Sequence, residues 1–139
     1  MLGGLNEPVF NGAIIENTWT TISEMAEVLF PFLGLIKGLK NKMLKLNWDN
    51  LAQVKKIKIP ILFVTGDLDT FVPTEMTRKL YSASLSTQKE LWVVKGGNHN
   101  DTSMVAGDEY VVRLQTFFKK NRSSTEEPKG NHSNILIKC

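Results

Sequence analysis

Three short apolar runs, separated by longer amphipathic stretches, constrain the fold of this chain most strongly. They are Val9 to Glu16 (VFNGAIIE), Ile59 to Thr65 (IPILFVT) and Glu90 to Val94 (ELWVV). Nearly continuous apolar runs of this length are typical of strands buried on both faces of a parallel sheet. Because helical stretches follow each run, the alternation predicts an α/β fold with about three parallel strands and flanking helices.

Helical periodicity predicts the elements between and after the strands. The first helix should begin near a cap at Thr20 or Thr21 and end at Pro31. Thr74 is expected to cap a helix that runs to about Ala83. A short helical turn that leads into a strand is expected within 47–58, and further helices at 34–46 and 107–120. The last of these has an apolar stripe of Tyr110, Val111, Leu114, Phe117 and Phe118.

The composition fits one small domain with a polar carboxy-terminal tail. The chain has 139 residues, 42% of them hydrophobic, and a formal net charge of +3. Its basic residues are spread along the sequence, as on solvated surfaces, and it contains no phosphate-binding glycine loop or nucleic-acid module. We therefore expect a domain over residues 1–120, a disordered tail over 121–139 and no nucleic-acid partner.

The sequence leaves localisation open. The single cysteine, Cys139, cannot form an internal disulfide, so no oxidising compartment is indicated. No uncharged apolar stretch reaches the roughly 18 residues of a transmembrane helix. The first residues, MLGGLNEP, do not have the basic and apolar regions of a signal peptide.

Two carboxylates follow the second apolar run on a short turn that ends in proline. The segment Gly66 to Pro73 reads GDLDTFVP, and it places Asp67 and Asp69 just beyond the carboxyl end of a predicted strand. Open α/β sheets bind ligands at that position. Taken alone, the turn also fits a structural role in which either aspartate bonds backbone amides and caps the next helix.

A histidine follows the third apolar run in the loop KGGNHNDT. His99 lies between a predicted strand and a predicted helix, where an imidazole suits acid–base chemistry near neutral pH. Taken alone, the loop also fits a histidine with local hydrogen bonds only, followed by Asp101 or Thr102 as a helix cap.

The two patterns are more informative together. Adjacent parallel strands lie about 5 Å apart, so loops that leave their ends can bring Asp69 and His99 together. An aspartate bonded to one imidazole nitrogen leaves the other nitrogen free to accept a proton from a serine. The acid precedes the histidine, which fits the chain order serine, acid, histidine of α/β-hydrolase triads.

The two motifs resemble the acid and histidine region of the α/β-hydrolase superfamily. They read strand-G-D-x-D-x-x-V-P-helix and strand-x-G-G-N-H-N-D-T, and HNDT together with ENTWTTISEMAEVLFPFL resembles the Bem46-like group in particular. The resemblance covers about residues 9 to 120. It implies a serine hydrolase in which His99 is general base and then general acid, and Asp69 orients it. Asp67 matches a variable position and receives no catalytic role.

The resemblance also implies a layout and a chemistry. Residues 18–58 would form a cap or lid segment, and the whole would be a partial α/β-hydrolase fold. The implied substrate is a small-molecule or lipid ester or thioester, and neither a metal nor an organic cofactor is implied. Members of this family are often membrane-anchored.

The sequence departs from the family at the nucleophile. The family's serine lies in a G-x-S-x-G elbow, and none of the eight serines here has glycine two residues before and two after. We therefore expect a truncated chain that does not hydrolyse esters alone. Missing strands would pair with Val9 to Glu16, so an exposed sheet edge, open to a protein partner, is expected there.

Three functions remain open from the sequence. The chain is part of an active hydrolase whose serine lies upstream, a non-enzymatic remnant that binds a protein or a lipid, or an inactive and unstable product. An in-frame upstream strand-G-x-S-x-G-helix would identify the first. A partner that orders the edge strand would identify the second, and rapid degradation without a partner the third.

Overall fold

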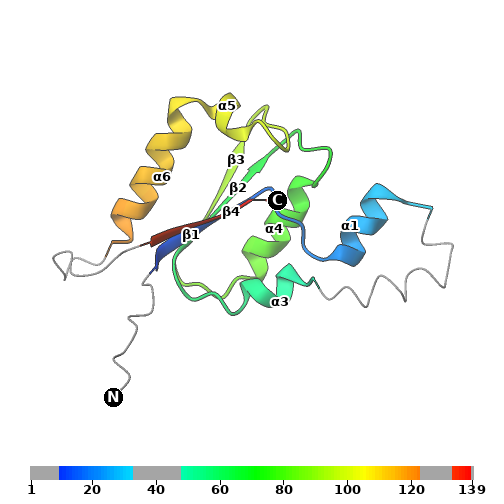
Figure 1. The fold of residues 1–139 in the computed structure, drawn as a ribbon, viewed down its shortest axis with the longest axis horizontal. Helices are drawn as coiled ribbons and strands as arrows, with labels where there is room; N and C mark the ends of the chain where they lie inside the picture. Colours follow the sequence, from blue (N-terminus) through cyan, green and yellow to red (C-terminus); the bar gives the residue numbers. More distant parts are fainter. Residues whose placement is uncertain (1–9, 33–47, 123–132, 139) are drawn as a thin grey trace, which may run out of the picture.

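The described part of the chain contains one parallel sheet with helices on both of its faces (Figure 1). The structure is a computed structural model that describes residues 10–32, 48–122 and 133–138, the last of these by their backbone. The strands are β1 (Phe10–Glu16), β2 (Ile61–Gly66), β3 (Lys89–Val94) and β4 (Ser133–Lys138). Their order is β3-β2-β1-β4, and each neighbouring pair is parallel. The predicted α/β class and the first three strands are confirmed.

Apart from one short addition, the described helices lie close to the ranges predicted from the sequence. They are α1 (Ile22–Leu29), α3 (Asn50–Val54), α4 (Thr74–Ala83), α5 (Thr102–Ala106) and α6 (Asp108–Lys120). Thr21 caps α1 as predicted, because its hydroxyl accepts the Glu24 N–H at 3.1 Å. The helix predicted at 34–46 lies outside the described residues.

Thr74 does not cap α4, so that prediction was wrong. It is the first residue of the helix, which follows Pro73, and its hydroxyl donates instead to the Gly66 carbonyl at 2.6 Å. Proline is well suited to the start of a helix because its missing N–H would have no partner there. The threonine therefore ties the start of α4 to the end of β2.

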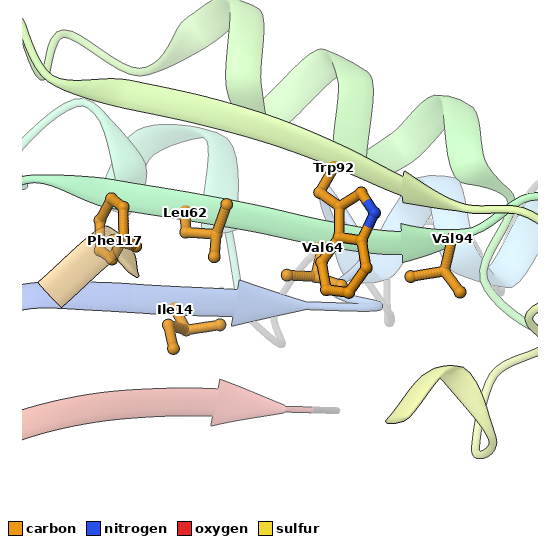
Figure 2. Close-up of a cluster of buried hydrophobic side chains, with 6 residues drawn as sticks. All are labelled: Ile14, Leu62, Val64, Trp92, Val94 and Phe117. Carbon is orange, nitrogen blue, oxygen red and sulfur yellow. The ribbon is translucent and has the colours of Figure 1, made fainter. Parts of the chain in front are cut away.

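Alternating side chains of the strands form two apolar cores, one on each face of the sheet. On one face, α6 contributes Phe117 to a cluster with residues from β1, β2 and β3 (Figure 2). The members of this cluster are Ile14, Leu62, Val64, Trp92, Val94 and Phe117. On the other face Leu80 of α4 and Val54 of α3 pack against Ile15, Ile61 and Phe63. Burial on both faces explains the nearly continuous apolar runs in the sequence.

The predicted apolar stripe of α6 is only partly correct. Phe117 is buried, and Tyr110, Leu114 and Phe118 pack partly against the same core. Val111 is 54% exposed and points away from it. The short helix α5, which turns the chain between the histidine loop and α6, was not expected.

The prediction of an open edge at β1 was wrong, and so was disorder throughout 121–139. Strand β4, from the end of that segment, pairs in parallel with β1, where Ala13 is opposite Ile135 and Ile15 is opposite Ile137. A strand with unpaired backbone groups readily accepts another strand, and the apolar ILI segment supplies one. Within the described part of the chain, no helix has the length and apolar character needed to cross a membrane.

Candidate active site

Asp69 and His99 meet at the carboxyl ends of two adjacent strands. Asp69 follows the end of β2 at Gly66, and His99 follows the end of β3 at Val94. The His99 Nδ1 atom lies 2.9 Å from the Asp69 Oδ2 atom. The structure thus places the two predicted residues in hydrogen-bond contact, as parallel strand geometry suggested.

The Asp69 carboxylate has a structural role and a histidine-binding role at once. Its Oδ1 atom accepts the N–H groups of Phe71 at 2.9 Å and of Val72 at 2.8 Å, which is the Asx turn considered from the sequence. Its Oδ2 atom is left for His99. The side chain is fully buried, and its three hydrogen-bond partners are the two N–H groups of the turn and the His99 ring. The bonds to the turn fix the orientation of the carboxylate.

His99 has one ring nitrogen committed to Asp69 and one left for chemistry. Because a carboxylate only accepts hydrogen bonds, Nδ1 carries the proton and Nε2 of the neutral ring has a free lone pair. The His99 side chain is 12% exposed, and the Phe71 ring lies 4.9 Å from it between centroids. A hollow of about 400 Å³ adjoins the imidazole, lined by Phe71, Asn98, His99, Asn100 and Asp101.

The loops that carry the two residues are in direct backbone contact. The Leu68 N–H donates to the Gly97 carbonyl at 2.9 Å, and the Gly96 N–H donates to the Asp67 carboxylate at 2.6 Å. A Cβ on Gly66 would lie 2.1 Å from the Gly97 oxygen, so only glycine permits this approach. The Asp67 carboxylate therefore joins the two loops.

The histidine loop is also held by its own polar side chains. The Asn98 side-chain oxygen accepts the His99 N–H at 2.8 Å, and the Asp101 carboxylate accepts the Asn98 N–H at 2.5 Å. Asp101 immediately precedes α5 but makes no capping bond to it with its side chain. The helix-cap role considered for Asp101 is therefore replaced by a bond within the loop.

Sequence comparisons identify relatives over most of the chain. A profile of the family described as Serine aminopeptidase, S33 (Hydrolase_4) matches residues 35–102, which include Asp69 and His99. Protein bem46 of Schizosaccharomyces pombe is 30% identical over 121 residues. The α/β-hydrolase domain-containing protein WAV2 of Arabidopsis thaliana is 34% identical over 125 residues.

The chain belongs to the α/β-hydrolase superfamily. Solved structures show the same fold: a thermophilic esterase from Thermogutta terrifontis gives a TM-score of 0.52 at 12% identity, covering 81% of this chain and 57% of that one. An α/β-hydrolase from the Mar Chica lagoon metagenome gives 0.51 at 19% identity, covering 79% and 50%. The bem46 and WAV2 alignments cover 86% and 83% of this chain but 39% and 41% of those proteins, so it spans about two fifths of their length.

Two residues of this α/β-hydrolase chain contact the site and were missed by sequence reasoning. The Asn17 side-chain amide donates to the His99 carbonyl at 2.6 Å, and its oxygen accepts the Gly66 N–H at 3.3 Å. The buried Glu16 carboxylate accepts hydroxyl groups from Thr102 and, at 2.8 Å, from Tyr110. A Glu-Asn pair at the end of the apolar run, with Glu16 as the last residue of β1, was the available signal.

Helix α1 of this α/β-hydrolase chain borders the turn from Asp69 to Val72 (the acid turn). Met25 of α1 packs with Val72 and Met76, close to the Asp69 turn. Among the side chains that the structure describes, no serine hydroxyl bonds His99. In the same part of the chain, no three His, Cys, Asp or Glu side chains are grouped so that they could hold a metal ion.

Proposed function

We propose that Asp69 and His99 are the acid–base pair of a site that hydrolyses an ester or thioester. The observation that carries the proposal is the 2.9 Å contact between a largely buried imidazole and a fully buried carboxylate. His99 Nε2 would take a proton from a nucleophilic hydroxyl and return it to the leaving group. Asp69 would keep the other proton on Nδ1 and stabilise the imidazolium that forms.

The nucleophile is the part of this mechanism that the 139 residues do not provide. None of the eight serines lies in a G-x-S-x-G pattern. We infer that the chain is a truncated hydrolase that does not turn over esters alone, and that the serine comes from other sequence. Loss of a triad serine typically lowers kcat by about 10⁶-fold.

Labelling with a fluorophosphonate probe tests this inference. The purified chain, a His99→Ala variant and an active serine esterase as positive control would each be incubated with the probe. We expect labelling of the esterase alone. Stoichiometric labelling of the chain that His99→Ala abolishes would show that one of its own serines is activated, and the inference of an inactive chain would be wrong.

The surface beside α1 favours an apolar acyl group as the substrate class. Large apolar side chains are exposed along the end of α1 and after it, with Phe30 at 56% and Phe32 at 78% exposure. Met25 of the same helix packs with Val72 of the acid turn, so α1 lies beside the site. An acyl chain bound there would bury apolar area at roughly 25 cal/mol per Å².

A second candidate function, apolar-ligand binding without catalysis, rests on the same exposed residues. Trp48 is 65% exposed and provides a fluorescence signal near the start of α1, since its neighbour Asp49 forms a backbone bridge with Thr21. Titration with a long-chain fatty alcohol should change that fluorescence, and a Phe30→Ser/Phe32→Ser double variant should weaken the response. Equal responses from both proteins would exclude the surface as a binding site.

A further inference from the structure

The side chain of Asn17 links the end of β2 to the loop that carries His99 through two hydrogen bonds. It follows β1 directly and has φ of +46°, in the left-handed region that asparagine adopts more readily than most residues. Its side chain is fully buried. One end of the amide donates to the His99 carbonyl at 2.6 Å, and the other accepts the Gly66 N–H at 3.3 Å.

The Asn17 amide therefore connects the end of β2, the strand that precedes Asp69, to the backbone of His99 itself. Gly66 ends β2, three residues before Asp69. The backbone N–H of Asn17 donates to the Val64 carbonyl at 3.0 Å, which fixes its position on β2. A donor and an acceptor in one rigid group thus set the separation between the start of the acid turn and the His99 backbone.

The neighbouring residue holds the other end of the same loop. Glu16 is fully buried, and its carboxylate accepts the hydroxyl of Thr102, the first residue of α5, as well as that of Tyr110 on α6. A buried carboxylate is stable only where donors satisfy it. Consecutive residues at the end of β1 thus hold the histidine loop at His99 and at Thr102.

We propose that Asn17 is a positioning residue for His99. By holding the His99 carbonyl against β2, its amide keeps the imidazole Nδ1 within hydrogen-bond distance of the Asp69 carboxylate. This inference rests on the proposed acid–base role of that pair. Displacement of a catalytic group by about 1 Å can lower a rate by about 100-fold, so a fixed backbone here matters for the chemistry.

The test is solvent exchange of the His99 Nδ1 proton, followed by NMR on the intact chain. Asn17→Gly removes the amide and tolerates the positive φ. Asn17→Asp keeps the size and the acceptor for Gly66 but replaces the donor with an oxygen that repels the His99 carbonyl. Both variants should speed exchange of this proton at least tenfold. Asn50→Ala is the matched control, because it also removes one amide-to-carbonyl bond, to Trp19 at 2.9 Å, outside the histidine loop.

The outcomes separate this inference from the proposed function. Fast Nδ1 exchange in both Asn17 variants, with Asn50→Ala like the wild type, supports the positioning role. A protected Nδ1 proton that stays within twofold of wild type in both variants overturns it, as does equal acceleration in Asn50→Ala. The absence of a protected Nδ1 proton in the wild type would instead overturn the Asp69–His99 pair, and with it the proposed function.

Discussion

A methyl group added at Gly66 should separate the two loops that form the site. The new Cβ would lie 2.1 Å from the Gly97 oxygen and 2.4 Å from its carbonyl carbon, whereas ordinary contacts begin near 3.4 Å. Both neighbours are backbone atoms, so no side chain can rotate away and one loop must move by about 1 Å. Overpacking of this kind costs about 1–3 kcal/mol. Loss of the Leu68–Gly97 hydrogen bond adds about 1 kcal/mol.

Urea unfolding of Gly66→Ala, with the His99 side-chain NMR signals recorded in parallel, measures this effect. We expect a loss of about 2–4 kcal/mol in the free energy of unfolding and a weakened His99–Asp69 hydrogen bond. Gly107→Ala is the control: its φ of +55° and ψ of −133° strongly favour glycine, and nothing lies within 4 Å, so it should cost about 1–3 kcal/mol of backbone strain and leave His99 unchanged. Stability of Gly66→Ala within about 0.5 kcal/mol of wild type would refute the reasoning.

Two further predictions concern pH and can be checked by thermal unfolding across a pH series. Burial, and then the hydrogen bond to Glu16, raise the pKa of the Tyr110 hydroxyl well above its usual value. The contribution of Tyr110 to stability is therefore complete below about pH 10 and is lost as pH rises further. Tyr110→Phe should remove this alkaline loss; an unchanged alkaline profile would contradict it. Burial raises the pKa of Glu24, but hydrogen bonds from Lys79 and Thr20 outweigh this effect and leave the pKa below its usual value. The contribution of Glu24 to stability is therefore present above pH 4.5 and is lost as pH falls further. Lys79→Met should therefore flatten the acid side of the profile, and a profile as steep as wild type would count against the ion pair between α1 and α4.

The sheet and the Asp69–His99 contact could be predicted from the sequence because both follow from local patterns. Apolar runs buried on both faces mark β2 and β3, and parallel pairing brings the loops after them to one edge. The spacing could not reveal that the Asp69 carboxylate serves both an Asx turn and the imidazole, with one oxygen for each. In the sequence, a structural role for Asp69 in the turn and a role beside the histidine were alternatives, but a carboxylate has enough acceptor sites for both.

The missed features depend on contacts between distant parts of the chain. Asn17 and His99 are 82 positions apart, and nothing near Asn17 indicates which carbonyl its amide binds. β4 carries a short apolar segment in a polar tail, and its strand conformation comes from pairing with β1, over a hundred residues earlier. The stripe predicted on α6 failed at Val111 because helical spacing defines a face only to within about one position.

The tautomer of His99 tests the central claim most directly. Two-bond ¹H–¹⁵N spectra of the neutral imidazole identify which nitrogen carries the proton, and His99→Ala assigns the signals against those of His132. If Asp69 orients His99, the wild type carries the proton on Nδ1, and Asp69→Asn, whose amide can donate to that nitrogen, shifts the proton to Nε2. A wild-type ring protonated mainly on Nε2, with the same spectrum in Asp69→Asn, would contradict the account.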